Sequence, residues 1–363
     1  MKIAFRADAS LQIGTGHIMR CLTLARALRA LGHQCAFLSR EHDGNLNFYV
    51  RNEGFAVHEM PLGESRASNV DADLAHGSWL GVSQEEDATQ SAAFLSGWEP
   101  DWVVVDHYGL DHRWESHARK HCSRLFVIDD LVDRAHQCEA LLDQTLGRIA
   151  GDYLGLTPSD CRVFAGPEFA LLRPEFSSLR PHSLTRRASP HLRQILISMG
   201  GVDQQNATAT VLETLRASTL DRSCRLEVVL GATAPWLDHV RSVAPTMPFQ
   251  TEVLAGVRDM ANRMASCDLA IGAAGSTSWE RCCLGVPTLM VVLAENQRPS
   301  AAALAQHGAS ILLGDVPEIG VRLPQALASV TDLRTLRRMS QAAASVCDGM
   351  GVQRVASFMG TMW

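Results

Sequence analysis

Short apolar runs alternate along the chain with longer amphipathic segments. In the first half, apolar runs that predict strands lie at residues 2–7, 34–38, 102–105 and 125–128. The last two are apolar without interruption, which is typical of strands buried on both faces of a parallel sheet. Residues 18–31 instead repeat their apolar positions with the period of a helix, and Gly32 is suited to cap it. This alternation predicts an α/β fold.

The same alternation resumes after a stretch rich in proline and arginine. Residues 174–194 contain Pro174, Pro181 and Pro190 among several arginines, and we expect them to form a loose linker. Beyond this stretch, strands are predicted at residues 195–198, 226–230, 269–271 and 288–293, and helices at 277–284 and 301–307. Most of 324–358 is predicted to be helical, with Pro324 at a first helical position.

Two α/β halves of similar size follow from this pattern. The 363 residues suit two domains at about 150 residues each. We place an N-terminal domain at residues 1–178 and a C-terminal domain at 192–340. A helical tail at 341–363 is expected to pack back on the N-terminal domain. The polar stretch 65–90, which contains a run of three acidic residues, is expected to be a solvated loop or an exposed helix face.

Charge and composition narrow the classes of function. The chain holds 33 Lys and Arg against 39 Asp and Glu, and this net charge of -6 argues against binding nucleic acid through bulk positive charge. No apolar run reaches the roughly 18 residues that a membrane span needs. Arg6 and Asp8 interrupt the first apolar run, so it does not resemble a signal peptide, and we expect a cytoplasmic protein.

The ten cysteines and fourteen histidines are scattered along the chain. No cysteines are spaced as CxxC and no histidines as HExxH, so neither type shows the spacing of a metal site. We therefore expect reduced cysteines that pack as small apolar side chains, no metal and no cofactor. The sequence leaves the oligomeric state open.

A glycine-rich turn joins the first predicted strand to the first predicted helix. Gly14 and Gly16 lack a Cβ, so the backbone can approach a ligand at the carboxyl end of the strand, where open parallel sheets bind ligands. His17 begins the helix and is placed to act as a general base. The alternative is that His17 only caps or packs the helix. The turn is not a dinucleotide fingerprint, because its third glycine would fall at Met19, and it lacks the lysine of a P-loop.

Two loops in the second half can hold phosphates. Gly200 and Gly201 follow a predicted strand and either cradle a phosphate or form an ordinary tight turn. After the strand at 269–271, small residues let backbone N–H groups approach a diphosphate, and hydroxyls add donors; these residues are Gly275, Ser276 and Thr277.

Three further positions carry polar groups suited to a nucleotide or a sugar. Glu280 lies one turn into the helix and can accept both hydrogens of a ribose diol, or it can close a capping box with Thr277 as N-cap. Asn296 and Gln297 follow a strand end, and their amides suit hydrogen bonds to sugar or phosphate, although such turns are also common without a ligand.

Another segment with polar side chains, Asp106-His107-Tyr108-Gly109, follows the strand at 102–105 in the first half of the chain. Tyr108 or His107 is placed to line the same cleft as His17, because the carboxyl ends of parallel strands share one edge of a sheet. For the acidic residues of this segment and of the helix that follows, a structural role is the favoured interpretation.

Taken together, these segments resemble a known family. The resemblance runs from Met1 to about Gly314 and is carried by residues 5–8, 14–22, 106–109, 128–130, 170–176, 198–203, 272–287 and 296–297. The chain resembles the UDP-2,4-diacetamido-2,4,6-trideoxy-β-L-altropyranose hydrolases of pseudaminic acid biosynthesis. It is more distantly similar to the N-acetylglucosaminyltransferases of peptidoglycan synthesis.

The resemblance implies a GT-B fold, in which two Rossmann-like domains face each other across a cleft and the nucleotide lies mainly on the C-terminal one. It implies that water attacks C1 of a UDP-sugar with inversion and that UDP leaves. The chain also has no DxD segment between its halves to hold a metal-bridged diphosphate, so we expect no metal. His17 matches the family's catalytic histidine and Tyr108 an active-site tyrosine. Glu280 and Asn296 match nucleotide-contacting positions.

The chemistry of the residues agrees with this implication. UDP is already a good leaving group, so the carboxylate pair of ordinary glycosidases is not required, and one base with an anion-stabilising pocket suffices. Three alternatives stay open. They are an inverting UDP-sugar glycosyltransferase with a non-water acceptor, a UDP-N-acetylhexosamine 2-epimerase, and a nucleotide-sugar sensor that turns nothing over.

Overall fold

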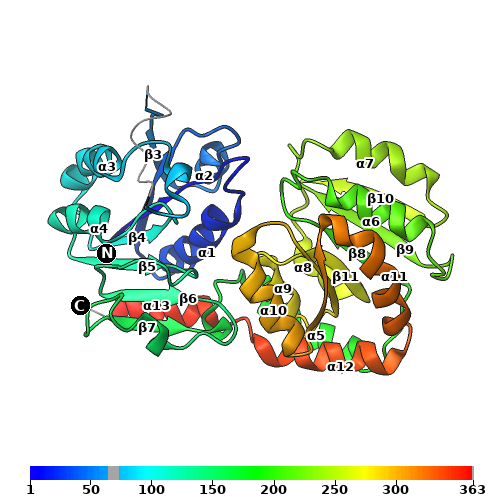
Figure 1. Ribbon diagram of the computed structural model, residues 1–363. Coiled ribbons are helices and arrows are strands. Elements are labelled where there is room, and N and C mark those ends of the chain that lie inside the picture. The colour runs from blue at the N-terminus through cyan, green and yellow to red at the C-terminus, as the bar shows by residue number, and fades with distance from the viewer. Residues whose placement is uncertain (64–72, 362–363) are drawn as a thin grey trace. The chain divides into compact units, whose positions relative to one another are not determined.

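The computed structural model describes residues 1–63 and 73–361 and divides the chain into two compact units (Figure 1). Unit 1 comprises Met1–Leu171 and the segment from Gly351 onward, and unit 2 comprises Leu172–Met350. Each unit is built on one sheet whose strands are all parallel, with helices between them. No helix in the described ranges combines the length and the apolar character needed to cross a membrane.

Unit 1 holds a seven-stranded sheet in the order β3-β2-β1-β4-β5-β6-β7. Its strands are β1 (Lys2–Ala7), β2 (Gln34–Arg40), β3 (Ala56–Met60), β4 (Trp102–Asp106), β5 (Arg124–Ile128), β6 (Ala140–Asp143) and β7 (Arg162–Ala165). Its helices are α1 (Gly16–Ala30), α2 (Asn47–Asn52), α3 (Gln84–Trp98), α4 (His112–Ala118) and α13 (Gly351–Thr361).

The two faces of this sheet bury separate apolar cores. Ile3 and Phe5 of β1 pack with α1, α2 and α13, whereas Ala4 between them packs with α3 and α4 on the other face. This is the two-residue period of a strand buried on both sides. The strands predicted at 2–7, 34–38, 102–105 and 125–128 and the helix predicted at 18–31 are confirmed, with ends that differ by two residues at most.

Unit 2 holds a six-stranded sheet in the order β10-β9-β8-β11-β12-β13. Its strands are β8 (Gln194–Ser198), β9 (Arg225–Leu230), β10 (Gln250–Ala255), β11 (Leu269–Ala273), β12 (Thr288–Val292) and β13 (Ser310–Asp315). Its helices are α5 (Pro174–Arg187), α6 (Ala207–Arg216), α7 (Leu237–Val243), α8 (Met260–Ser266), α9 (Thr277–Cys283), α10 (Arg298–Gln306), α11 (Ile319–Val330) and α12 (Leu333–Val346).

The prediction of a loose linker at residues 174–194 is wrong, because most of this stretch forms the helix α5 of unit 2. Pro174 occupies the first turn, where a missing N–H is harmless, and Pro181 lies inside the helix. Arg180 holds α5 in place by donating to the carbonyl oxygens of Cys283, Ala344 and Cys347. Pro324 likewise lies inside α11 rather than at its start, since that helix begins at Ile319.

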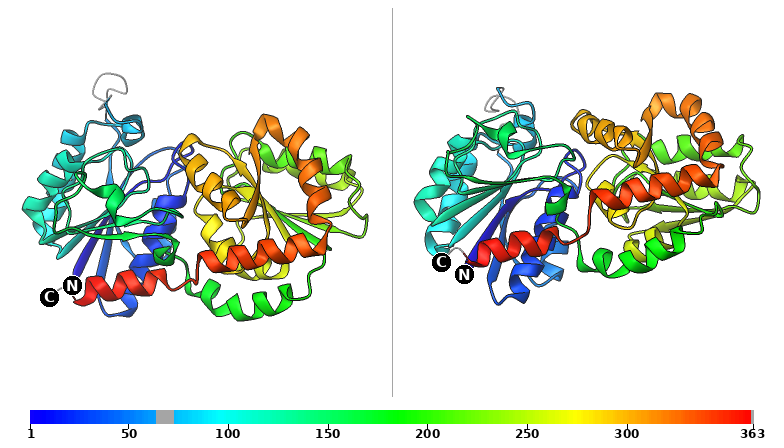
Figure 2. Two further views of the ribbon diagram at one scale, coloured as in Figure 1. Left: turned by 60° about the horizontal axis from the view of Figure 1, so that its bottom comes forward. Right: turned by 90° about the horizontal axis from the view of Figure 1, so that it is seen from below.

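The C-terminal residues return to unit 1. Helix α12 belongs to unit 2. Helix α13 packs against α1 of unit 1, as the views of Figure 2 also show. Gly351 begins α13 with its Cα against the backbone of Phe169 and Ala170, where a Cβ would lie 2.3–2.6 Å from backbone atoms. The side chains of Val355 and Met359 are fully buried in the core that α13 shares with α1.

Both sheets reverse their strand order at one place. In unit 1 the reversal lies between β1 and β4, and in unit 2 it lies between β8 and β11. Open α/β sheets bind ligands beyond the carboxyl ends of the strands at such a point. The loops that follow these four strands contain most of the residues that the sequence singled out.

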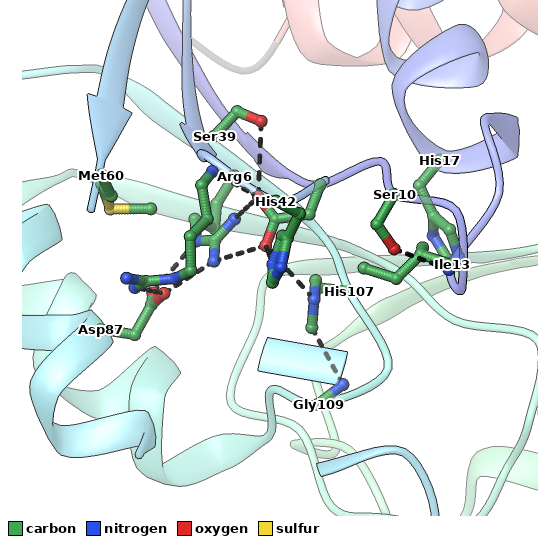
Figure 3. Close-up of polar contacts among 12 residues, drawn as sticks. Arg6, Ser10, Ile13, His17, Ser39, His42, Met60, Asp87, His107 and Gly109 are labelled. Carbon is green, nitrogen blue, oxygen red and sulfur yellow. Dashed lines mark hydrogen bonds and ion pairs between the residues drawn. The ribbon is translucent and has the colours of Figure 1, made fainter. Parts of the chain in front are cut away.

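A fully buried cluster of four charged side chains lies at the carboxyl end of β1 (Figure 3). Arg6 donates to both oxygens of Asp8 at 2.7 and 2.9 Å and to both oxygens of Asp87 of α3 at 3.0 and 2.7 Å. Arg40, at the end of β2, donates from Nη2 to Asp87 at 2.5 Å and from its backbone N–H to Asp8 at 2.7 Å. Two positive and two negative charges therefore balance inside the unit, as burial requires.

Asp87 corrects the expectation for the stretch 65–90. The carboxylate is fully buried and also accepts from Trp114 Nε1 at 2.8 Å, so this part of α3 is not a solvated face. Arg6 and Arg40 supply the counter-charges that let an acidic residue turn inward. Residues 64–72 of the same stretch lie outside the described residues.

His107 joins this cluster to the loop after β4. Its Nδ1 accepts the backbone N–H of Gly109 at 3.0 Å, and its Nε2 lies 3.4 Å from Asp8 Oδ2 (Figure 3). Burial lowers the pKa of His107 to about 3, so the ring is neutral and carries its proton on Nε2, toward Asp8. His107 thus connects the turn after β1 to the turn after β4.

A second buried histidine has the opposite electrostatic setting. His136 Nδ1 lies 2.7 Å from Glu115 Oε1, and its Nε2 lies 3.8 Å from Asp129 Oδ2. Burial opposes the charged ring, but the carboxylates of Glu115 and Asp129 raise the pKa of His136 to about 9. Near neutral pH the ring of His107 is therefore neutral and the ring of His136 is protonated.

We predict that Met359→Ala destabilises unit 1 by about 2–5 kcal/mol, because the substitution leaves a cavity between α13 and α1. Chemical denaturation followed by tryptophan fluorescence measures this loss. Met350→Ala is the matched control, since that side chain is 42% exposed. Equal effects of the two substitutions would contradict the buried position of α13.

We also predict that the combined contribution of these two histidines to stability is largest near pH 6.5. His107 has a folded-state pKa of about 3 against about 6.5 when unfolded, so its contribution is complete above pH 6.5 and is lost as the pH falls toward 3. His136 has a folded-state pKa of about 9, so its contribution is complete below pH 6.5 and is lost as the pH rises through 9.

Urea unfolding at a series of pH values tests both slopes. His107→Gln is expected to flatten the dependence between pH 5 and 6.5, and His136→Gln the dependence between pH 6.5 and 8.5. The expected slope from each histidine is about 1.4 kcal/mol per pH unit. If the slope in one of these pH ranges is unchanged after the histidine assigned to it is replaced, that histidine does not cause the pH dependence.

Candidate functional site

The turn between β1 and α1 is held by its own hydrogen bonds. Ser10 Oγ accepts the backbone N–H groups of Gln12 and Ile13 at 3.1 and 2.8 Å, and Gly14 N–H donates to the carbonyl of Ser10 at 2.8 Å. Gly14 has a φ of +80°, a conformation that glycine adopts without strain. The turn therefore sets where α1 begins, and His17 lies in its first turn.

Asp106, the last residue of β4, binds His17. Its Oδ1 lies 2.5 Å from His17 Nδ1, and Arg20 of α1 donates to both of its oxygens, from Nη2 at 2.7 Å and from Nε at 2.6 Å. Because β4 lies next to β1 in the sheet, Asp106 and the turn that carries His17 meet at the same edge.

The charge of Asp106 determines the tautomer of His17. Burial alone would raise the pKa of Asp106, but Arg20 and His17 hold it well below its usual range, so the carboxyl is ionised. An ionised carboxylate can only accept hydrogen bonds, so His17 Nδ1 carries the proton that is donated. In the neutral ring, Nε2 is then the nitrogen with a free lone pair, and it makes no hydrogen bond within the described residues. This is the arrangement of a general base oriented by a carboxylate.

Tyr108 packs against His17 with its ring. The two ring centroids lie 4.6 Å apart in an edge-to-face arrangement, and Trp79, in the 3₁₀ turn Gly77–Leu80, lies next to both. The Tyr108 hydroxyl donates to Asp130 Oδ1, and Arg20 donates to Asp130 Oδ2 at 3.1 Å. Tyr108 therefore shapes the surroundings of His17, while its hydroxyl is engaged with a carboxylate of the protein.

In unit 2, Gly200 and Gly201 follow β8 as predicted. Gly200 has a φ of +88°, and the carbonyl oxygen of Gly201 lies only 2.0 Å from where a Cβ on Gly231 would be. Asp203 ends this turn by accepting the backbone N–H groups of Ala207 and Thr208 at 2.9 and 3.0 Å. The turn is thus compact and is tied to the start of α6.

Gly275, Ser276 and Thr277 form the loop between β11 and α9. Ser276 is the N-cap of α9 and makes no side-chain capping hydrogen bond, and Thr277 is the first helical residue. The capping box proposed as the alternative for Glu280 is therefore absent from this helix. Glu280 therefore does not cap the start of α9.

Glu280 instead lies beside Arg173. Its Oε1 accepts from Arg173 Nη2 at 3.4 Å, a long contact that leaves the carboxylate capacity for further donors. Burial raises the pKa of Glu280, and Arg173 opposes this change. Arg173 stands immediately before α5 and belongs to the segment 170–176 that carried part of the family resemblance.

Asn296 and Gln297 lie in a 3₁₀ turn just past β12, Glu295–Gln297. Gln297 Oε1 accepts the backbone N–H of Leu293 at 3.0 Å, and its Nε2 lies 3.8 Å from where a Cβ on Gly275 would be. The amide nitrogen of Gln297 thus faces the loop that contains Gly275. Asn296 is half-buried and makes no hydrogen bond within the described ranges.

The sequence alone did not predict the contacts of three residues around His17 and Tyr108: Asp106, Arg20 and Asp130. Asp106 was interpreted as structural, but it is the partner of His17. A signal was present, because an acidic residue at the end of the strand next to β1 is expected at the same sheet edge. Arg20 gave no such signal, since an arginine one turn into a helix is usually exposed, and here its exposed fraction is only 7%.

Within the described ranges, no three His, Cys, Asp or Glu side chains converge as metal ligands.

The comparisons with known proteins agree with this architecture. Residues 195–354, nearly all of them in unit 2, match the glycosyltransferase family 28 C-terminal domain. The crystal structure of MurG from Acinetobacter baumannii is similar over 99% of both chains, with a TM-score of 0.70 and 16% sequence identity. Together with the two parallel sheets, this likeness shows the GT-B fold.

Two relatives match most of the chain. The UDP-2,4-diacetamido-2,4,6-trideoxy-β-L-altropyranose hydrolase of Campylobacter jejuni is 24% identical over 309 residues, which are 85% of this chain and 97% of that protein. An uncharacterised protein of Methanocaldococcus jannaschii is 25% identical over 305 residues, or 82% of this chain, and the match spans 57% of that protein's length. The chain thus has a GT-B fold, its residues 195–354 match the glycosyltransferase family 28 C-terminal domain, and it resembles the UDP-altropyranose hydrolase of Campylobacter jejuni along most of its length.

Proposed function

We propose that the chain hydrolyses a UDP-linked 2,4-diacetamido-2,4,6-trideoxyhexose to the free sugar and UDP, as a step in pseudaminic acid biosynthesis. The observation that carries the proposal is the His17–Asp106 pair, with Arg20 on the other side of the carboxylate. This pair supplies the one base that hydrolysis of a UDP-sugar requires. The resemblance to the Campylobacter jejuni hydrolase supports the choice of substrate.

In the proposed reaction, His17 Nε2 takes a proton from water as the water oxygen attacks C1 of the sugar. The bond between C1 and the β-phosphate oxygen breaks, and UDP leaves with the electron pair. Asp106 stabilises the imidazolium that forms, and inversion at C1 follows from attack opposite the leaving group. Gly14 and Gly16 let the backbone approach the sugar, while Tyr108 packs against the base.

Unit 2 is proposed to bind UDP. The loops after β8, β11 and β12 reach one edge of its sheet and bring Gly200, Gly201, Gly275, Ser276 and Thr277 to that edge with Gln297. Glu280 is proposed to accept the ribose hydroxyls, and Asn296 to contact the substrate. Backbone N–H groups and hydroxyls then replace the metal that many nucleotide-sugar enzymes use, so we expect activity to persist in EDTA.

An inverting glycosyltransferase is the second candidate. The match of unit 2 to a glycosyltransferase domain favours it, because the same base can activate an acceptor hydroxyl instead of water. A panel of UDP-sugars with water as the sole acceptor separates the two. Release of UDP and free sugar at a rate of many turnovers per minute supports hydrolysis, whereas release only after an acceptor is added would contradict it.

His17→Ala is predicted to lower the rate of hydrolysis roughly 10²–10⁴-fold, the usual contribution of a general base, while UDP affinity stays unchanged. Asp106→Asn is predicted to lower kcat with little effect on KM, because an amide no longer requires His17 Nδ1 to carry the proton. Steady-state kinetics measures both effects. His117→Ala, an exposed histidine of α4, is the control, and equal activities of these three variants would rule out this base.

Glu280→Ala is predicted to weaken UDP binding by about 1.5–3 kcal/mol, the contribution of a charged hydrogen bond, without unfolding the protein. Calorimetric titration of UDP measures the change. Glu213→Ala removes an exposed glutamate of α6 and serves as the matched control. If both variants bind UDP as the unmodified protein does, Glu280 does not contact the nucleotide.

A further inference from the structure

Arg281 is a buried cation in unit 2 that makes no ion pair within the described residues. Its exposed fraction is 2%, although it follows directly after Glu280 in α9. Its guanidinium donates from Nη2 to the carbonyl oxygen of Ala273 at 2.6 Å and to Ser278 Oγ at 3.1 Å, and from Nη1 to Thr277 Oγ1 at 3.2 Å. Its Nε is buried and has no acceptor.

The guanidinium lies at the point where the strand order of unit 2 reverses. Gly272 of β11 pairs with Ser198 of β8 across this point. A Cβ on Gly272 would lie 2.7 Å from Arg281 Nη1 and 2.8 Å from the carbonyl oxygen of Ser198. The missing side chain of Gly272 therefore makes the space that the guanidinium occupies, between the ends of β8 and β11.

Two other arginines of unit 2, the buried Arg187 and the half-buried Arg180, donate to carbonyl oxygens that hold the fold together. Arg187 donates to the carbonyl oxygens of Leu284 and Met264, and Arg180 donates to those of Cys283, Ala344 and Cys347. These carbonyls lie in or next to the last turns of α8, α9 and α12, whose negative ends suit a cation. Arg187 also donates to a hydroxyl, Ser183 Oγ at 3.2 Å, but that serine lies within its own helix α5. Arg281 differs because the two hydroxyls that accept from it stand in the first turn of α9, directly after the loop that follows β11.

The direction of the hydrogen bond between Arg281 and Thr277 leaves the Thr277 hydroxyl able to donate to a ligand. A guanidinium has only donors, so Thr277 Oγ1 must accept from Arg281. The hydroxyl proton of Thr277 is then free to be donated to another group, and Thr277 is half-exposed. A hydroxyl that accepts from a cation and donates outward is a good donor to an anion.

The positive charge of Arg281 also attracts an anion to the loop after β11. Burial lowers the pKa of Arg281 to about 10, so the guanidinium keeps its charge at neutral pH even though desolvation disfavours it. An anion near the loop would relieve that cost, since a buried charge is stabilised by an opposite one.

We propose that Arg281 is a positioning residue that sets the affinity of the loop 272–277 for the diphosphate of a nucleoside diphosphate, acting through the hydroxyl of Thr277. The proposal rests on the proposed binding of UDP by unit 2 and deepens it. It assigns the recognition of the phosphates to a charge beneath the loop. The net charge of -6 is therefore no obstacle to binding an anion here.

Calorimetric titration with uridine, UMP, UDP and inorganic pyrophosphate tests the proposal on the full chain. Arg281→Met is expected to weaken binding of UDP and pyrophosphate about 10- to 100-fold and to leave uridine affinity unchanged, because only the phosphates face the lost charge. Arg281→Lys, which keeps the charge, is expected to recover part of the loss. A merely structural role would weaken uridine and UDP alike.

Arg187→Met is the matched control, because it removes a buried arginine of the same unit. It is expected to lower the free energy of unfolding without changing the ratio of UDP to uridine affinity. Thr277→Val tests the same path without removing the charge, and it is expected to weaken UDP but not uridine. If Arg281→Met does not fold, the UDP affinity of Thr277→Val tests the proposal in its place.

Two results would overturn the proposal: a folded Arg281→Met that binds UDP as the unmodified protein does, or a Thr277→Val with unchanged UDP affinity. These results are distinct from failure of the hydrolase proposal. A chain that binds UDP through Arg281 but hydrolyses no UDP-sugar would refute only the hydrolysis. A chain that hydrolyses the sugar while Arg281→Met binds UDP normally would refute only the role of Arg281.

Discussion

The buried carboxylate of Asp106 is the interaction on which the geometry of the candidate base depends. Its two oxygens are shared between His17 and Arg20, so its ionisation, the tautomer of His17 and the orientation of the ring are coupled. The parallel pairing of β1 and β4 brings the two partners together from positions 89 residues apart in the chain. Removing the carboxylate would therefore change the chemistry of His17 without touching its side chain.

Buried charged side chains lie near the ends of strands in both units. Arg6, Asp8, Arg40 and Asp87 form a balanced cluster beneath the turn that carries His17. Arg281 lies at the corresponding reversal point of the second sheet without a carboxylate partner. A balanced cluster holds a loop in place, whereas an unbalanced charge has electrostatic attraction left for a ligand. This difference separates the positioning of the base from the proposed recognition of the phosphates.

The elements of the fold could be predicted from the sequence where the local pattern was strong. The apolar runs of β1 and β4 and the Gly14–Gly16 turn are local signals, and the structure has the elements they predict. The helix α5 could not be predicted, because its prolines point to a loop, and tertiary hydrogen bonds from Arg180 override that local preference. Asp87 was missed for a related reason, since its counter-charges lie in β1 and β2, far away in the sequence.

The residues of the candidate site likewise fall into those that the local sequence predicts and those that depend on the tertiary structure. The glycines and His17 are recognisable from spacing alone, since strand, turn and helix are contiguous in the sequence. The partner of His17, the position of Arg281 beside Gly272 and the missing capping box of Glu280 depend on strand order and side-chain direction. No periodicity within one segment encodes those features. Knowing that β4 lies beside β1 would have been enough to assign Asp106.

Incubation with a UDP-sugar in water enriched in heavy oxygen tests whether water attacks C1 of the sugar. If His17 delivers water to C1, mass spectrometry finds one heavy oxygen in the released sugar, at the hydroxyl of C1, and none in UDP. Label in UDP would mean that water attacks phosphorus and that the bond between C1 and oxygen stays intact. That result would contradict the role assigned here to His17 and Asp106.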